Sequence, residues 1–504
     1  MASSYSLEEV ESIAFSDIRV TQRTAPLFTL DGREVDIWSP EYTKYHSRTV
    51  TDQIRESIKT REASGQDVFP DVVGKQEEKE LAKRALFSGS PILFRGDRGF
   101  GKTTFSKAIT QLLEPKMLAI AGCKIHDDPT RPACFACKWK ISHQEKVELV
   151  WTPRIWIRIP GDPMLTTRQL IGGVSIQKLR EGFDLDHPEV FVPGRALKAN
   201  RGIGYFDELG AIPSSLQTML HELLEEHQIT TSEGDLVPMK IDSLEIASTN
   251  PSNYRGTSAI KEPLTDRMEI IDFGPPETVE EEIEIAMRNM FYFKNFGKPA
   301  PIPIWHQRLM AQIVRTGRDG VRGKVRLAAG LSCRATIKLF DHVYSSTERR
   351  GGRVPLLLDY GRSFDAVRLA LNGRIELEHG TRISKDDLIT MMVAEAMKQE
   401  CKWIYDNFLP SELFDALISE LHDMGYDGKS ESLIRIQPST LELLRGHSVL
   451  NRILNKMCPG SEPEFLLSAL EAILSSLATC SDYVSLSDGG YVVKEVARNA
   501  EASV

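Results

Sequence analysis

The stretch GDRGFGKT, residues 96–103, decides the fold, because it fits the pattern G-x-x-x-x-G-K-[S/T] in full. A short apolar run, SPILFR (90–95), precedes it, and a helical pattern, TTFSKAITQLLEP (103–115), follows it. In this context glycines turn backbone N–H groups toward a phosphate, and the helix N-terminus adds partial positive charge. The pattern predicts a nucleotide-binding loop whose contact residues are Gly96, Asp97, Arg98, Gly99, Phe100, Gly101, Lys102, Thr103 and Thr104.

Within this loop we expect Lys102 to reach the β- and γ-phosphates of ATP and Thr103 to hold Mg²⁺. The segment GIGYFDE (202–208) supplies an acidic partner, since an apolar strand there ends in Asp207 and Glu208. We expect Asp207 to bind Mg²⁺ and Glu208 to act as general base for the attacking water. Without the phosphate loop, the same pair would be explained as a solvated strand end.

A third polar residue, Asn250, follows the apolar run SLEIAST (243–249). Ligands of parallel sheets bind at the carboxyl ends of the strands, where an amide can orient the lytic water. Asn before a proline, here Pro251, is also typical of a turn. Both interpretations stay open from the residues alone.

The order of the predicted elements indicates an α/β fold, a doubly wound parallel sheet. Further strands are expected at 154–160, 202–206, 243–249 and 268–274, with helical patterns between them, and the segments beyond Pro276 are predominantly helical. The hairpin pattern YVSLSDGGYVV (483–493) follows the last helix. The predicted organisation is an N-terminal arm at 1–68, an α/β core at 69–276 with a Cys-rich insertion at about 120–147, a helical segment at 277–400, and a helical C-terminal module at 401–504.

Composition limits the class of protein. The 504 residues are 41% hydrophobic and 26% charged, with a formal net charge of −9, which excludes a disordered chain, a collagen and a small disulfide scaffold. We expect a cytoplasmic protein, because we recognise neither a signal peptide nor a run of 18 apolar residues. Charge is uneven: 315–353 holds ten basic and three acidic residues, whereas 404–504 holds seven basic and fifteen acidic ones. The acidic balance makes nucleic acid an unfavourable partner.

Three cysteines and a histidine, in Cys123-x-x-His126…Cys134-x-x-Cys137, form a separate cluster after the first core helix. Three thiolates and one imidazole at these spacings suit a tetrahedral structural Zn²⁺. His143 is an alternative fourth ligand. Thiols of a reducing compartment also need no metal, so the cluster is equally compatible with a variable loop.

Five segments occur together in one order: VVGKQEEK (72–79), GDRGFGKT, VPGRALKANRGIGYFDEL (192–209), ASTNP (247–251) and EPLTDRMEIIDFG (262–274). As a set they resemble the ATPase subunit (subunit I) of magnesium chelatase and its MoxR-like relatives among the AAA+ proteins. The resemblance covers about residues 69–400. It implies a P-loop AAA+ core with an all-α lid at 277–400, assembled as a homo-oligomeric ring, commonly a hexamer.

The resemblance also assigns roles to residues outside the loop. Val73 and Gly74 match the adenine-flanking start of the core, and Asn250 matches sensor 1. Arg267 matches the arginine that reaches a neighbouring subunit's γ-phosphate, although a salt bridge with Asp266 or Glu269 is the simpler interpretation. Arg334 matches the sensor 2 arginine, with Arg326 as a competitor.

Two insertions resemble those of the same subgroup, at 168–202 and 227–243, and the residues alone predict two surface hairpins there. The resemblance implies ATP hydrolysis that drives remodelling of a protein partner, a von Willebrand A-domain or chelatase-D-like protein. The alternative is the motor subunit of a magnesium porphyrin chelatase. A transcriptional activator or DNA helicase ranks last, because the loop GAFTGA is absent and the charge is unfavourable.

Overall fold

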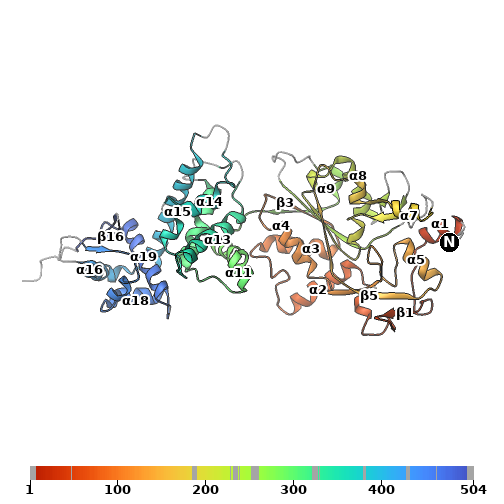
Figure 1. The fold of residues 1–504 in the computed structure, drawn as a ribbon, viewed down its shortest axis with the longest axis horizontal. Helices are drawn as coiled ribbons and strands as arrows, with labels where there is room; N and C mark the ends of the chain where they lie inside the picture. The colour runs from red at the N-terminus through yellow and green to blue at the C-terminus, as the bar shows by residue number, and fades with distance from the viewer. Residues whose placement is uncertain are drawn as a thin grey trace, which may run out of the picture. The chain divides into compact units, whose positions relative to one another are not determined.

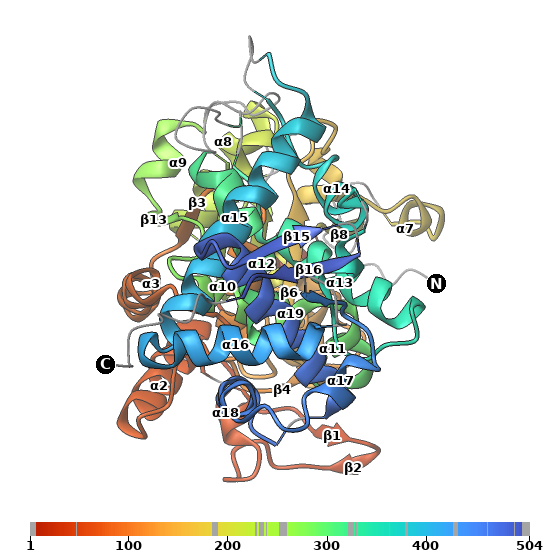
Figure 2. The same cartoon turned by 90° about the vertical axis from the view of Figure 1, so that its left-hand side faces the viewer.

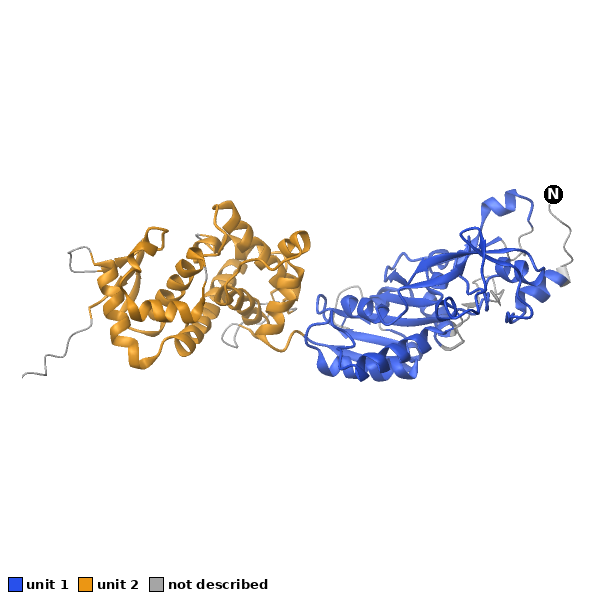
Figure 3. Ribbon diagram, turned by 90° about the horizontal axis from the view of Figure 1, so that it is seen from below, with its two compact units in different colours: residues 1–274 blue, residues 275–504 orange. Residues whose placement is uncertain are grey.

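The computed structural model divides into two compact units, residues 1–274 and 275–504, which are described separately (Figure 3). The described residues are 7–46, 48–183, 190–226, 229–230, 236–237, 239–250, 260–320, 327, 330–361, 363–377, 382–426, 432–460, 462–487 and 489–495.

The first unit is built on a five-stranded parallel sheet, in the order β13-β3-β12-β9-β6. Its strands are β3 (Ile92–Gly96), β6 (Ile155–Pro160), β9 (Gly202–Asp207), β12 (Ser243–Thr249) and β13 (Glu269–Phe273). All five predicted core strands are confirmed. Every residue of β12 is buried, as expected for a central strand covered on both faces.

Helices cover both faces of this sheet. On one face α2 (Val50–Ala63), α3 (Gln76–Ser88) and α4 (Lys102–Thr110) share an apolar cluster with alternate strand residues such as Phe94 and Tyr205. On the other face α8 (Ser214–Glu226) and α9 (Glu262–Asp266) pack against the intervening residues, such as Leu93 and Phe206. Figure 1 labels β3 of this sheet and the helices α3, α4, α8 and α9 of the same unit. The doubly wound α/β fold is therefore confirmed.

A second sheet, not predicted from the sequence, joins the N-terminal segment to the Cys-rich insertion. Its order is β2-β1-β5-β4, with β1 (Phe28–Leu30), β2 (Arg33–Glu34), β4 (Lys116–Ile120) and β5 (Val147–Pro153). β1 runs parallel to β5. Helix α1 (Leu7–Phe15) packs on α5 (Phe135–Ser142) of the insertion. Residues before 69 thus do not form a unit of their own.

Both expected hairpins are antiparallel pairs. The first pairs β7 (Gly172–Val174) with β8 (Phe191–Pro193), between α6 (Thr167–Leu170) and the core, and α7 (Ile176–Arg180) lies between its strands. The second pairs β10 (Ile229–Thr230) with β11 (Leu236–Val237). Residues 231–235, between these two strands, lie outside the described residues.

The second unit contains two apolar clusters. Helices of the first are α10 (Val279–Asn289), α11 (Phe291–Phe296), α12 (Ile304–Asp319), α13 (Cys333–Arg349), α14 (Asp365–Leu371) and α15 (Lys385–Phe408). The second gathers the end of α15 with α16 (Phe414–Gly425), α17 (Thr440–Leu443), α18 (Ser448–Met457) and α19 (Pro463–Cys480). The predicted helical segments are thus present, and α15 runs through both clusters.

The C-terminal hairpin is confirmed as β15 (Val484–Ser487) paired with β16 (Gly490–Val493) (Figure 2). A third strand, β14 (Ser432–Ile434), pairs with β16. One helix of the described chain, α19, is long and apolar enough to cross a membrane, where the sequence predicted none. Because 61% of that window is buried in the second cluster, α19 has the surroundings of a core helix.

Candidate nucleotide-binding site

The phosphate loop connects β3 to α4 through glycines that no other residue can replace easily. Gly96 has a φ of +156°, and a Cβ there would lie 2.1 Å from the carbonyl oxygen of Phe273 on β13. Gly101, with a φ of +98°, is the residue before α4. Positive φ is costly for residues with a Cβ, so the glycines fix the path of the loop. Consequently α4 begins at Lys102 with its first N–H groups directed at the loop.

Lys102 is buried, and its ammonium group lies among acceptors of the loop and of β12. Nζ donates to the carbonyl oxygens of Gly96 and Asp97, the latter at 3.0 Å, and to Asn250 Oδ1 at 3.2 Å. Burial lowers the pKa of Lys102 to about 8. The structure therefore places the loop lysine against the predicted sensor residue.

Asp207 and Thr103 meet at the hydroxyl of Tyr205. Tyr205 Oη lies 3.1 Å from Thr103 Oγ1 and donates to Asp207 Oδ1 at 3.2 Å. Ser248 Oγ also donates to Asp207 Oδ1 at 3.0 Å, and Arg158 Nε donates to Oδ2 at 2.9 Å. A hydroxyl and a carboxylate on one side of the loop are the hard oxygen ligands that Mg²⁺ prefers.

Glu208 has the left-handed backbone conformation, with a φ of +65°. Its N–H donates to Ser248 Oγ at 3.1 Å. Its Oε1 accepts from Arg98 Nη2 at 2.7 Å and from Asn250 Nδ2 at 3.1 Å. A non-glycine residue with positive φ is strained and is often found at functional sites. The acid predicted as general base thus lies between the phosphate loop and the end of β12.

The remaining predicted positions belong to the phosphate loop, to the start of α4 and to the segment before α3. Phe100 is buried and Thr104 is exposed, while Gly99 has a φ of +84°. Val73 and Gly74 are half-buried just before α3. No ligand contact can be assigned to these residues from the geometry, so their roles stay predictions.

The two arginines assigned by resemblance lie at helix ends, Arg267 in the first unit and Arg334 in the second. Arg267 directly follows α9, where its Nη1 donates to the carbonyl oxygen of Pro263 at 2.9 Å. Arg334 is exposed in the first turn of α13, in the second unit. Arg326, the competitor for sensor 2, lies outside the described residues. Both assignments stay predictions.

Sequence reasoning missed three residues that orient the acidic pair: Arg158, Tyr205 and Ser248. Each belongs to the carboxyl-terminal part of a core strand next to Asp207, on β6, β9 and β12 respectively. The signal was present, because residues near the ends of adjacent parallel strands meet at one edge. Their polar character inside apolar runs could have marked them.

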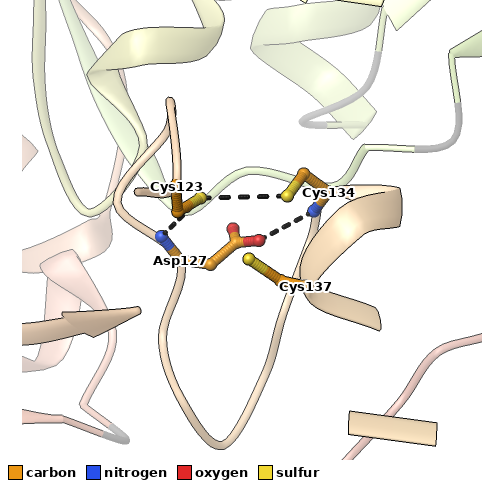
Figure 4. Close-up of side chains that lie close together, drawn as sticks. All are labelled: Cys123, Asp127, Cys134 and Cys137. Carbon is orange, nitrogen blue, oxygen red and sulfur yellow. Dashed lines mark hydrogen bonds between the residues drawn. The ribbon is translucent and has the colours of Figure 1, made fainter. Parts of the chain in front are cut away.

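The cysteine cluster requires a correction. The donor atoms of Cys123, Cys134 and Cys137 come together with a carboxylate oxygen of Asp127, and His126 is not a member of the group (Figure 4). The chain turns at His126, whose φ is +55°, and places Asp127 in the interior. The alternative ligand, His143, is exposed and stacks on Trp139.

Similar proteins are found among magnesium chelatases. The 38 kDa subunit of Acidiphilium rubrum is 26% identical over 202 residues, which is 39% of this chain and 55% of that protein. The 38 kDa subunit of Cereibacter sphaeroides is 25% identical over 229 residues, 44% of this chain and 64% of that protein. The matched region thus spans less than two thirds of these relatives.

A chain in a structure of the complex between the BchI and BchD subunits of magnesium chelatase is 17% identical and has a TM-score of 0.32. The match covers 64% of this chain and 98% of that one. No protein-family model matches the sequence. The assignment therefore depends on the sequence relatives, the strand order and the phosphate loop. The chain has a doubly wound α/β fold with a phosphate loop, and it resembles the ATPase subunit of magnesium chelatase.

Proposed function

We propose that the chain is a Mg²⁺-dependent ATPase. The observation that carries the proposal is the hydrogen-bonded convergence of Lys102, Glu208 and Asn250 at one edge of the parallel sheet. Lys102 would exchange its contacts with loop carbonyls for the β- and γ-phosphate oxygens of ATP. Thr103 and Asp207 would hold Mg²⁺, which neutralises charge on the phosphates when bound.

Glu208 and Asn250 are the residues available to act on water. Glu208 offers a carboxylate that can accept the proton of an attacking water, and Asn250 offers an amide that can orient the same water. Their present contact, Nδ2 to Oε1 at 3.1 Å, shows that both side chains reach one small region. Glu208 directly follows β9 and has a left-handed backbone, and its carboxylate is held in that region by Arg98 and Asn250.

The proposal is tested by measuring ATP binding and ATP hydrolysis for three variants. Lys102→Ala should weaken ATP binding, whereas Glu208→Gln should bind ATP and hydrolyse it at least about 100-fold more slowly, as expected when a general base is removed. Lys107→Ala, an exposed lysine on the same helix, is the matched control and should behave as the wild type. Unchanged turnover in both site variants would rule the mechanism out.

Assembly and partner follow from the resemblance and are part of the same proposal. We infer a homo-oligomeric, hexameric ring in which Arg267 of one subunit reaches the γ-phosphate bound by the next subunit. Arg334 is the proposed sensor 2 arginine of the helical lid. Particle mass measured with and without ATP tests this, and a monomer under both conditions would contradict it.

The ring is proposed to remodel a protein partner that has a von Willebrand A-domain. The C-terminal module and the cysteine-rich insertion of this chain support this function. The alternative is a motor for a magnesium porphyrin chelatase, the kind of complex to which the similar 38 kDa subunits belong by name. The neighbouring genes distinguish the two, since only the chelatase needs a tetrapyrrole-binding subunit beside this one. The proposed cofactors are ATP and Mg²⁺, with a structural Zn²⁺ at the cysteine group.

A further inference from the structure

A group of four side chains in the insertion has the geometry of a mononuclear metal site. The sulfur atoms of Cys123, Cys134 and Cys137 and one carboxylate oxygen of Asp127 all lie within 4.8 Å of one another. In Figure 4 the side chains of Cys123, Asp127 and Cys134 come from the loop between β4 and α5, and Cys137 comes from α5 itself. One ion can therefore contact all four donors at once.

The separation of two sulfur atoms indicates the kind of bond that this site makes. Cys123 Sγ and Cys134 Sγ are 3.8 Å apart, far more than the roughly 2.05 Å of a disulfide. Two thiolates bound to one tetrahedral Zn²⁺ at about 2.3 Å each lie about 3.8 Å apart. The thiols are thus spaced as ligands of a common ion.

Asp127 has the burial and the support expected of a ligand. Its side chain is fully buried. Oδ2 accepts from the N–H of Cys134 at 2.9 Å, and Oδ1 accepts from Asn200 Nδ2 at 3.4 Å. The N–H of Asp127 in turn donates to Cys123 Sγ at 3.3 Å. Second contacts of this kind hold metal ligands in position.

Hydrogen bonds connect the loop that carries this site to the main sheet. Asn200 and Arg201 immediately precede β9, and both hydrogen-bond to the loop that carries the cysteines. Asn200 Nδ2 donates to the carbonyl oxygen of Ile125 at 3.0 Å, and Arg201 Nη1 donates to the carbonyl oxygen of His126 at 3.3 Å. The N–H of Asp242, just before β12, donates to Asn200 Oδ1 at 2.9 Å. The loop is therefore fastened to the amino-terminal edge of the main sheet.

The nucleotide-binding residues lie at the opposite edge. β9 has six residues, and Glu208 follows its last one, so about 20 Å of strand separates the two sites at 3.3 Å per residue. An ion at the cysteine group cannot contact ATP at that distance. Its role must be structural.

We propose that Cys123, Asp127, Cys134 and Cys137 bind one Zn²⁺, and that this ion fastens the second sheet and α5 to the AAA+ core. The inference deepens the zinc part of the proposed function and does not depend on ATP hydrolysis. It replaces the histidine expected from the sequence with an aspartate. Metal content and local protection report on it even if the ATPase proposal fails.

The first test is the metal content of the full-length protein, purified without a histidine tag. Elemental analysis should give about one zinc per chain, and Co²⁺ exchanged into the site should show the charge-transfer absorption of bound thiolates and tetrahedral d–d bands. Less than about a tenth of an equivalent of zinc together with no Co²⁺ spectrum would overturn the proposal. Iron with acid-labile sulfide would overturn it as well.

The second test compares variants at the fourth position. Asp127→Ala should lower zinc affinity, measured by chelator competition, at least tenfold, whereas His126→Ala should retain wild-type affinity. Cys480→Ser, which changes an exposed cysteine outside the group, is the matched control. Loss of zinc from His126→Ala with full retention in Asp127→Ala would overturn the assignment of Asp127.

The structural role is tested on the wild-type chain, so that it does not depend on a variant that folds poorly. Removal of zinc by a chelator should speed amide hydrogen exchange in residues 116–142 and leave residues 92–104 of β3 and the phosphate loop unchanged. If removal of zinc left the exchange rates of both segments unchanged, the ion would not stabilise the loop against the core.

Discussion

The guanidinium group of Arg98 donates a 2.7 Å hydrogen bond to the carboxylate of Glu208, so an ion pair joins the phosphate loop to the end of β9. The same carboxylate oxygen accepts from Asn250 Nδ2. These two hydrogen bonds occupy the lone pairs of Oε1. For a water to hydrogen-bond to Oε1, the contact with Arg98 must first be weakened.

We therefore predict that Arg98→Gln modestly raises the rate constant of ATP hydrolysis. The Arg98 and Glu208 side chains are 54% and 28% exposed, and such pairs contribute about 0.2–1 kcal/mol. Releasing the pair should raise kcat by about 1.5- to 5-fold, and the gain should shrink at high salt, which screens the pair in the wild type. Steady-state kinetics at low and high salt, with Lys107→Ala as control, provide the measurement. A tenfold loss of kcat would instead place Arg98 on the nucleotide.

The pH dependence of nucleotide affinity should follow Lys102. Burial lowers the pKa of its ammonium group to about 8, so this group is charged below pH 8 and loses its proton above it. A phosphate needs the charged form, and binding above pH 8 must therefore take up a proton. We predict that the Kd for ATP rises above pH 8, by up to tenfold per pH unit.

Lys102→Arg is the matched variant for this pH profile, because a guanidinium group stays charged over the whole range. Its Kd for ATP can differ from that of the wild type, but its slope above pH 8 should be flat. Titration of a fluorescent ATP analogue from pH 7 to about 9.5 gives both curves. Parallel curves would mean that another group controls the dependence.

The main sheet could be predicted from the sequence because its strands are short apolar runs with clear ends. The second sheet could not, since β1 has only three residues and pairs with β5, more than a hundred residues later. A local hydrophobic pattern does not indicate which distant strand a segment pairs with. The sequence therefore predicts an N-terminal arm at 1–68 without indicating that a strand of this arm pairs with β5.

The spacing of the cysteines correctly predicted that three of them lie together, but it did not identify the fourth side chain of the group. The motif logic selected His126 because histidine is a common zinc ligand. The backbone turn at this residue decides otherwise and brings Asp127 into the group. Similarly, the bonds from Arg158 and Ser248 to Asp207 join neighbouring strands of the sheet, which a linear pattern does not show.

Arg267 should act across a subunit boundary if the chain forms the proposed ring. Arg267→Ala alone should lose most hydrolysis but retain ATP binding, since an arginine at the γ-phosphate is worth about 10³–10⁵ in rate. Mixing Arg267→Ala with Lys102→Ala subunits should restore part of the activity, because some interfaces then combine an intact lysine with an intact arginine. The total ATPase rate across mixing ratios is the measurement. Rates that never exceed those of the separate variants would place Arg267 in its own subunit's structure.

The free energy of unfolding should depend on pH through Glu245, a fully buried acid in the middle of β12. Burial raises its pKa from 4.5 to about 8, and Ser243 Oγ donates to its carboxyl group. Between pH 4.5 and 8 the folded chain holds a proton that the unfolded chain has lost. Stability must therefore fall as pH rises through this range, by at most about 1.4 kcal/mol per pH unit.

Glu245→Gln removes the titrating group while keeping its shape and its hydrogen-bond acceptor. We predict that the variant has nearly the wild-type stability at pH 5 and becomes progressively more stable than the wild type toward pH 8. Urea unfolding of the first unit at several pH values measures the difference, with the exposed Glu148→Gln on β5 as control. A difference that is the same at pH 5 and pH 8 would mean that Glu245 is ionised within the folded sheet. In that case its charge would have to be balanced by a group close to the strand.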